Sequence, residues 1–418
     1  MVIHCFNRKV LSIYHRYQNA LSNLGYLTFF QIANMLFPFL LYPILIKAFG
    51  MELYGHVVYA NGVALFFSVF ISYGYNLSAT KKIAENFGNI KNINQIFSVT
   101  IFSKGILFLI AIAMYFVVIC AFIDKEDRSY YYYSIGALIM EFLCPIWFFQ
   151  GVNKLKNLVI VNFVIKLITF LSILILVSET TDLNSYLIIN MSSLSAIGII
   201  SFLTAIFYLN VRFTKIDIQE LKDSFVDGWS VFLSTFLISI KDRSSIILIG
   251  AWIGKEYVVI YDLISKGLGL LSMPQNIIQT AFFPTICKNK NISEIKKIIY
   301  FVLTINTVLV FLSVPLVLFV RNEYILEVDI ISYILISSTA IFIGLSSSIA
   351  RFIYIPFELH GKYIRTLFAN MIFFVFSCVV LFAFYKPIDL IPYAFVLFFC
   401  SIFEAVIRAC SVKFIIQD

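Results

Sequence analysis

The feature that most constrains the fold is a series of twelve long apolar runs along the chain. They lie near residues 25–48, 54–75, 97–122, 130–150, 158–177, 185–209, 225–253, 258–286, 298–319, 330–352, 366–384 and 391–415. About 20 mostly apolar residues are enough for a helix to cross a bilayer. Hydrophobic residues make up 61% of the chain and charged residues only 13%, whereas soluble domains carry about 25% charged residues. The sequence therefore predicts an all-α polytopic membrane protein with about twelve transmembrane helices.

The distribution of Lys and Arg between the loops predicts the orientation of these helices. Cytoplasmic loops of membrane proteins are enriched in both residue types. If the N-terminus is inside, the loops on that side hold most of the basic loop residues, including Lys81, Lys82, Lys288 and Lys290. The loops on the other side hold few, and acidic residues are more frequent there. We therefore expect both termini on the cytoplasmic side of a bacterial inner membrane.

A weak internal repeat predicts how the helices are grouped. The segment Ile44–Phe49 in the first run resembles Ile247–Trp252 in the seventh, and a glutamate follows each, Glu52 and Glu256. Parallel repeats related by an axis along the membrane normal are one plan of membrane transporters. The repeat predicts two parallel six-helix lobes, residues 1–215 and 216–418, around a central cavity.

Sequence motifs of several enzyme classes are absent. The chain contains neither a phosphate-binding Gly-x-x-x-x-Gly-Lys-Ser/Thr loop nor a zinc-binding His-Glu-x-x-His motif. Its seven cysteines are scattered without a Cys-x-x-Cys pair, which is typical of free thiols. The net charge of +8 includes no compact basic run. We expect no enzymatic activity, no cofactor, no metal site and no nucleic-acid partner.

The informative residues are ionisable side chains within the apolar runs. Each costs roughly 2.5–3.5 kcal/mol at the centre of a bilayer, so it should face a partner or a water-filled cavity. Six are basic and four are acidic: Lys104, Lys166, Lys241, Arg243, Lys266 and Arg408, against Glu141, Asp242, Asp262 and Glu404. The excess of positive charge favours an anionic group, above all a phosphate or pyrophosphate, as the ligand.

The spacing of these residues leaves a functional and a structural interpretation open. Asp262 and Lys266, like Glu404 and Arg408, are four residues apart, the spacing of helical ion pairs. Such pairs could simply hold the bundle together, and Lys104 could extend to the membrane surface. In the seventh run, Asp242 shares a helical stripe with three small polar residues that could line a cavity, Thr235, Ser239 and Ser245.

Several segments resemble bacterial flippases that translocate O-antigen and other polysaccharide repeat units, the Wzx type. Tyr73–Ala84 resembles their Tyr-Gly-Phe-Asn-Leu-Ser-Ala-Thr segment, and Pro145–Gly151 resembles the end of their fourth span. Shorter similarities lie at Phe49-Gly50, Leu53–Gly55, Gly228-Trp229 and Phe283-Pro284, in the same order along the chain. The resemblance implies the multidrug/oligosaccharidyl-lipid/polysaccharide exporter superfamily.

The resemblance implies transport by alternating access of an undecaprenyl-pyrophosphate-linked oligosaccharide, with the lipid bilayer and other polysaccharide assembly proteins as further partners. The candidate substrate-binding residues are Lys241, Arg243, Lys266, Lys166 and Lys104. The candidates for ion coupling or charge balance are Asp242, Glu141, Asp262 and Glu404. The alternatives are a cation-coupled drug or solute antiporter of the same superfamily, a membrane enzyme such as an O-antigen polymerase, and a scaffold without transport.

Overall fold

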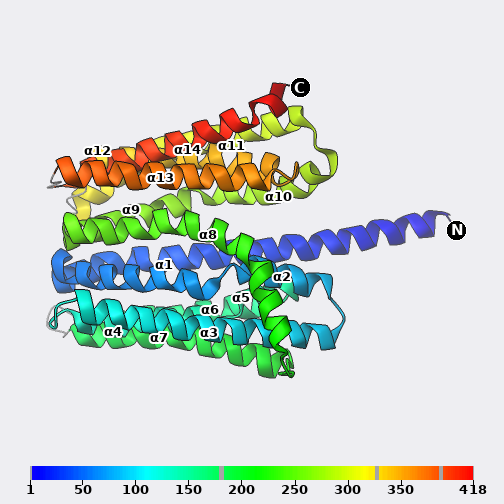
Figure 1. Ribbon diagram of the computed structural model, residues 1–418, viewed down its shortest axis with the longest axis horizontal. Helices are drawn as coiled ribbons and strands as arrows, with labels where there is room; N and C mark the ends of the chain where they lie inside the picture. Colours follow the sequence, from blue (N-terminus) through cyan, green and yellow to red (C-terminus); the bar gives the residue numbers. More distant parts are fainter. Residues whose placement is uncertain (1, 178–182, 325–328, 386–388, 418) are drawn as a thin grey trace. The chain divides into compact units, whose positions relative to one another are not determined.

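All regular secondary structure in the described part of the chain is helical (Figure 1). The computed structural model describes residues 2–177, 183–324, 329–385 and 389–417. Its helices are α1 (Val2–Ser72), α2 (Tyr75–Glu85), α3 (Ile90–Phe122), α4 (Arg128–Leu143), α5 (Ile146–Gly151), α6 (Leu155–Leu176), α7 (Leu183–Leu203), α8 (Ile218–Trp252), α9 (Lys255–Leu271), α10 (Met273–Asn289), α11 (Ile292–Tyr324), α12 (Ile330–Ile349), α13 (His360–Phe384) and α14 (Ile391–Gln417). Short π-helical turns extend α7 and α12. The prediction of an all-α fold is confirmed.

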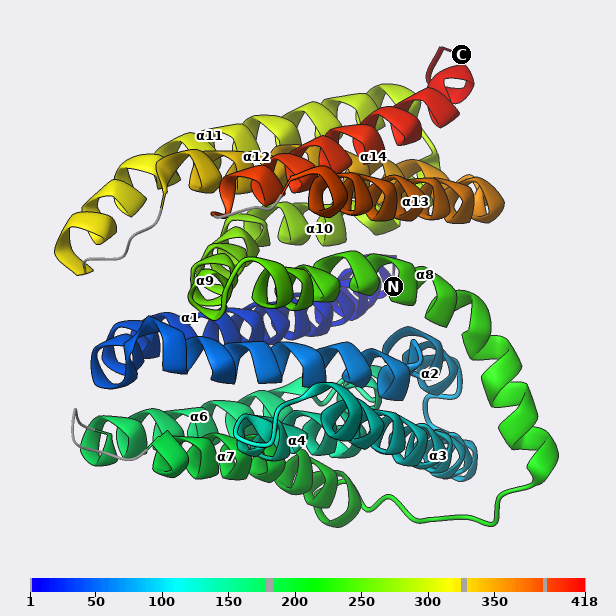
Figure 2. The ribbon, with the colours of Figure 1, turned by 60° about the vertical axis from the view of Figure 1, so that its left-hand side comes forward.

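The helices form two compact units. The first comprises Met1–Pro38 and Ala64–Thr235, and the second comprises Phe39–Val63 and Phe236–Asp418. Within the first unit α7 packs between α4 and α6, and within the second α12 and α14 pack closely, flanked by α11 and α13 (Figure 2). Because α1 and α8 each contribute to both units, the units are not two consecutive halves of the sequence. The two six-helix lobes, residues 1–215 and 216–418, stay a prediction.

Nine helical segments of the described part are long and apolar enough to cross a membrane. One of them, Thr28–Glu85, has 58 residues and covers most of the first predicted span and all of the second. The helix α8, predicted as the seventh span, is not among the nine, because charged and small polar residues occupy its middle. The helices α9 and α10 have 17 residues each and together occupy the predicted eighth span. The protein is therefore a multi-pass membrane protein, and the count of twelve spans stays a prediction.

Glycine and proline set several helix boundaries that the apolar runs alone do not mark. Gly50 interrupts α1 with φ 78° and ψ 166°, and Gly74 starts α2 in a left-handed conformation with φ 73°. Pro145 separates α4 from α5, and Pro274 lies in the first turn of α10. Proline has no N–H to donate inside a helix but fits the first helical turn. The predicted fourth and eighth spans are consequently each divided into two helices.

The two longest segments of the family resemblance pack against each other in the first unit. One segment contains α5, whose side chains of Trp147, Phe148 and Phe149 are almost completely buried. The other contains α2, on which Tyr75 and Ile83 are buried to the same degree. The Thr80 hydroxyl donates a hydrogen bond to the carbonyl oxygen of Trp147 at 3.0 Å. A Cβ atom on Gly151 would lie 2.6 Å from the Ile83 side chain. These motifs therefore form the core at one end of the unit.

Residues 55–62 of α1, which follow the first segment of the weak internal repeat, pack closely on α8 and α9 in the second unit. A Cβ atom on Gly250 would lie 2.2 Å from the Tyr59 ring, and one on Gly62 would lie 2.4 Å from Ile246. A Cβ atom on Gly55 would lie 2.2 Å from the carbonyl oxygen of Lys255. Small residues let helices in membranes approach closely, so these glycines determine how α1 packs on α8 and α9.

We expect Gly55→Ala to destabilise the second unit by about 1–3 kcal/mol, the usual cost of overpacking. The added methyl group would meet a backbone carbonyl, which cannot move aside as a flexible side chain can. Thermal unfolding of the detergent-solubilised protein measures the effect. Gly361→Ala is the matched control, because no heavy atom lies within 4 Å of the position of its new Cβ atom. Equal unfolding temperatures for the two variants would contradict the role of Gly55.

Candidate functional site

A buried cluster of charged and polar side chains in the second unit surrounds the carboxylate of Glu404. Lys241 Nζ lies 3.1 Å from Oε2 of Glu404, and Arg408 Nη2 lies 2.8 Å from Oε1. The Ser346 hydroxyl donates to Oε1 at 2.8 Å, and the Asn370 amide donates to Oε2 at 2.6 Å. We call these five residues the Glu404 cluster. One carboxylate thus accepts from four donors on α8, α12, α13 and α14.

The Glu404 cluster carries more positive than negative charge. Glu404 and Arg408 lie one helical turn apart on α14, as predicted from their spacing, and Arg408 also donates to the carbonyl oxygen of Ser346 at 2.9 Å. Arg408 is 3% exposed and Glu404 9%. Lys241 adds a second cation from α8 to the same carboxylate. Two cations therefore share the Glu404 carboxylate in a buried setting, and Asp242 is a further acidic neighbour of Lys241.

Neutral polar side chains continue from this cluster along α12. Gln279 donates to the hydroxyl oxygens of Ser347 and Ser348, both at 2.9 Å. Asn306 donates to Gln275 Oε1 at 2.6 Å. The sequence interpretation missed these residues, together with Ser346 and Asn370, because uncharged polar residues are common in membrane helices. Their adjacency becomes visible only when α10, α11 and α12 are packed.

A second charged group in the same unit consists of Tyr42, Asp262 and Lys266. Asp262 and Lys266 form the ion pair on α9 that their spacing predicts. The Tyr42 hydroxyl on α1 donates to Asp262 and lies 3.2 Å from Lys266 Nζ. Tyr42 is 1% exposed. The positive charge of Lys266 is thus balanced by a neighbouring carboxylate, unlike the charge of the Glu404 cluster.

In the first unit, Lys104 on α3 pairs with Glu141 on α4. The Lys104 ammonium lies 3.7 Å from Glu141 Oε1 and also donates to the Glu141 carbonyl oxygen. Only 1% of the lysine side chain is exposed. The alternative that Lys104 extends to the membrane surface is therefore wrong. The structure joins one predicted substrate-binding residue to one predicted charge-balancing residue.

The remaining three predicted residues are Asp242, Arg243 and Lys166. Asp242 is exposed and Arg243 is half-buried, because successive residues of α8 point in directions about 100° apart. Lys166 is half-buried on α6 of the first unit. Ser245, placed by the sequence on a cavity-lining stripe with Asp242, is instead buried and accepts a hydrogen bond from Tyr393 at 2.9 Å. That part of the stripe contributes to helix packing.

The fold is similar to that of a known class of membrane transporter. The inward-facing structure of a multidrug resistance MATE family transporter of the MOP superfamily superposes with a TM-score of 0.69. The match covers 93% of this chain and 95% of that one at 13% sequence identity. The chain is therefore an all-α, multi-pass membrane protein with the fold of MOP-superfamily transporters.

Sequence comparisons identify the family. A family profile described as polysaccharide biosynthesis protein matches residues 20–290, and the chain belongs to this family. A protein of Escherichia coli (strain K12) named as an O-antigen transporter is 27% identical over 280 residues, which cover 66% of this chain and 67% of that protein. A protein of Shigella dysenteriae with the same name is 30% identical over 234 residues, which cover 54% of this chain and 57% of that protein. The resemblance inferred from Tyr73–Ala84 and Pro145–Gly151 is confirmed.

Proposed function

We propose that this protein is a flippase that moves undecaprenyl-pyrophosphate-linked oligosaccharide repeat units across the bacterial inner membrane for the synthesis of O-antigen or another surface polysaccharide. Membership of the polysaccharide biosynthesis family and the names of its relatives support a polysaccharide-related cargo. The observation that carries the proposal is the Glu404 cluster, in which Lys241 and Arg408 share a single carboxylate. The charge left over suits a pyrophosphate, which accepts charge-assisted hydrogen bonds from both kinds of side chain.

In this proposal nine of the ten intramembrane charges have separate tasks, and the tenth, Arg408, completes the Glu404 cluster. Lys241 and Arg243 of α8 bind the pyrophosphate, with Lys266, Lys166 and Lys104 as further cationic positions along its path. Glu404, Asp262, Glu141 and Asp242 balance these cations or couple transport to an ion gradient. Alternating access of the two lobes, 1–215 and 216–418, moves the head group between leaflets. Both termini lie in the cytoplasm, and other polysaccharide assembly proteins receive the cargo.

A drug antiporter is the second candidate, because the similar structure is named as a multidrug resistance transporter. Such a protein would need an acidic site for its cationic substrates. Three of the four intramembrane carboxylates, those of Glu141, Asp262 and Glu404, instead form ion pairs with lysine or arginine. This pairing favours the flippase.

Deletion of the gene in its host should abolish surface polysaccharide and cause lipid-linked repeat units to accumulate in the membrane fraction. A plasmid copy should reverse both effects, and tolerance of cationic drugs should not change. Extraction of the lipid-linked oligosaccharides and gel analysis of the surface polysaccharide provide the two measurements. Normal polysaccharide together with lowered drug tolerance would instead establish the antiporter.

A further inference from the structure

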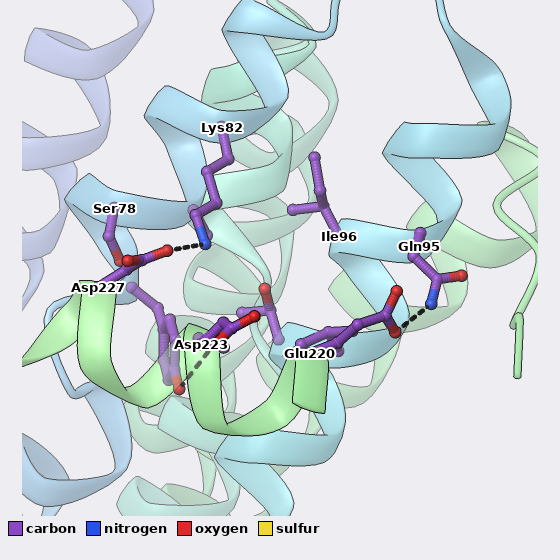
Figure 3. Close-up of a pocket in the computed structure, with 12 residues that line it drawn as sticks. Ser78, Lys82, Gln95, Ile96, Glu220, Asp223 and Asp227 are labelled. Atoms are coloured by element: carbon purple, nitrogen blue, oxygen red, sulfur yellow. Dashed lines mark hydrogen bonds and ion pairs between the residues drawn. The ribbon is translucent and has the colours of Figure 1, made fainter. Parts of the chain in front are cut away.

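The first unit contains a polar pocket that the intramembrane charges do not explain (Figure 3). Its volume is about 330 Å³, at the lower end of the roughly 300–1,000 Å³ of small-molecule sites. We call it the α2–α3–α8 pocket. Twelve residues line it: Tyr75, Ser78, Ala79 and Lys82 of α2, Gln95, Ile96, Val99 and Thr100 of α3, and Glu220, Asp223, Ser224 and Asp227 of α8.

Each helix presents one face to the α2–α3–α8 pocket, because its lining residues recur at helical spacing. On α2 they are separated by three, one and three residues, and on α8 by the same intervals. Residues three, four and seven apart share one face of a helix. The pocket face of α2 belongs to the segment Tyr73–Ala84 that resembles the flippase family. The other face of that segment packs on α5, so the motif has a structural side and a pocket side.

Two polar contacts between helices hold the walls in place. Lys82 Nζ lies 2.8 Å from Asp227 Oδ2 and joins α2 to α8. Gln95 Nε2 donates to Glu220 Oε2 at 2.5 Å and joins α3 to α8. Figure 3 shows both contacts as dashed lines at the sides of the pocket. The walls are therefore connected through side chains whose remaining polar atoms can face a ligand.

Negative charge predominates in the pocket. Three carboxylates, those of Glu220, Asp223 and Asp227, line it together with one cation, Lys82. The hydrogen bonds and ion pair of these carboxylates engage Oε2 of Glu220, Oδ1 of Asp223 and Oδ2 of Asp227. Within the described residues, the second oxygen of each carboxylate makes no hydrogen bond or ion pair with the protein and can accept from a ligand. A phosphate or pyrophosphate would be repelled here.

The side chain of Thr100 provides an independent indication of a ligand. Thr100 lines the pocket, is 3% exposed, and makes no hydrogen bond to any other described residue through its hydroxyl. Tyr75, beside it, is 2% exposed, and its hydroxyl already has two partners, Ser224 at 3.5 Å and Ser103. A ligand with several hydroxyl groups would supply the missing partner.

We propose that the α2–α3–α8 pocket binds an uncharged, hydroxyl-rich sugar residue of the cargo before translocation. Sugar hydroxyls would donate to the free carboxylate oxygens of Glu220 and Asp223 and exchange hydrogen bonds with Thr100. The inference rests on the proposed function and adds a sugar site that is separate from the cationic site for pyrophosphate. A metal ion fits less well, because no group of three or more ligating side chains in the described chain is placed to hold one.

Protection of an introduced cysteine tests the proposal in the full-length protein. All seven native cysteines are first replaced by serine or alanine, and the variant must still restore surface polysaccharide. Ser78→Cys is then labelled with a water-soluble maleimide in inverted membrane vesicles. The vesicles come from cells that make the repeat unit and from cells blocked in its synthesis. Labelling should be about tenfold slower with the repeat unit if its concentration is about ten times Kd.

Lys81→Cys is the matched control, because Lys81 is the exposed neighbour of Lys82 on α2 and does not line the pocket. Its labelling rate should be the same in both kinds of vesicle. Adding Asp223→Asn to the Ser78→Cys protein should remove the protection, whereas Glu85→Gln, an exposed carboxylate of α2 outside the pocket, should retain it. Equal labelling of Ser78→Cys in both vesicles, or equal protection at Lys81→Cys, would overturn the sugar site.

The outcome also separates this inference from the proposed function. If deletion of the gene abolishes surface polysaccharide but Ser78→Cys is not protected, the flippase proposal stands and the sugar site is wrong. If deletion leaves the polysaccharide and its lipid-linked precursor unchanged, the proposed function itself fails. The repeat unit is then not the cargo of this protein, and the sugar site is rejected together with the function.

Discussion

A Lys241→Ala variant should fail to restore surface polysaccharide to a strain that lacks the gene, although its amount in the membrane should stay normal. Lys241 contributes one of the two cations that share Glu404, so its removal cancels the excess positive charge of the cluster. The carboxylate keeps Arg408, Ser346 and Asn370 as donors. Loss of one hydrogen bond to a charged group costs about 1.5–3 kcal/mol, which a folded membrane protein can tolerate. Immunoblots and polysaccharide gels measure protein and product separately.

Lys222→Ala is the matched control for this experiment. Lys222 is an exposed lysine in the first turns of the same helix, α8, outside both the Glu404 cluster and the α2–α3–α8 pocket. The Lys222→Ala variant should restore the surface polysaccharide fully. Arg243→Ala should also reduce the product, because Arg243 is the second predicted pyrophosphate ligand on α8. Full restoration by both Lys241→Ala and Arg243→Ala would remove these residues from the site.

Glu404→Ala, in contrast to Lys241→Ala, should reduce the amount of folded protein. Its carboxylate is the shared acceptor for Lys241, Ser346, Asn370 and Arg408. Without it, the guanidinium of Arg408, which is 3% exposed, lies near another cation without an anion. Removing one partner of a buried ion pair costs about 3–5 kcal/mol. We expect a clearly lower unfolding temperature in detergent and a reduced amount in the membrane.

Two variants separate charge from packing at this position. Glu404→Gln keeps the shape and one acceptor oxygen, so its unfolding temperature should lie between those of the wild type and Glu404→Ala. Glu294→Ala removes an exposed carboxylate in the first turn of α11 of the same unit and should unfold like the wild type. A Glu404→Ala protein as stable as the Glu294→Ala protein would show that the cluster does not stabilise the fold.

Most helices were predictable because the bilayer imposes a simple requirement on the sequence. A run of about 20 apolar residues satisfies its own backbone hydrogen bonds only as a helix when surrounded by lipid. Runs such as 97–122 and 158–177 therefore correspond directly to α3 and α6. The predicted eighth span consists of two helices, because its apolar composition hides the break between α9 and α10 near Pro274. The composition of a segment indicates whether lipid or water surrounds it, but it does not indicate where the backbone turns.

The candidate site was predictable only where its partners share a helix. The pairs Asp262–Lys266 and Glu404–Arg408 follow from a separation of four residues, which places both side chains on one face. The contact between Lys241 and Glu404 joins residues 163 positions apart, so no local spacing indicates it. The same is true of Tyr42 and Asp262. Pairing of distant charges depends on which helix faces meet.

The sequence by itself determined that this chain is a multi-pass helical membrane protein and that its intramembrane charges are predominantly positive. Both properties follow from composition within single helices, which hydrophobic transfer and helical periodicity control. Only the tertiary structure decided which charges neutralise one another and which retain an excess, because that depends on contacts between α8, α12, α13 and α14. It also decided that the family segment Tyr73–Ala84 has a buried side and a pocket side. The apolar helices place the protein in the membrane, and the packing of their few polar faces determines what it can bind there.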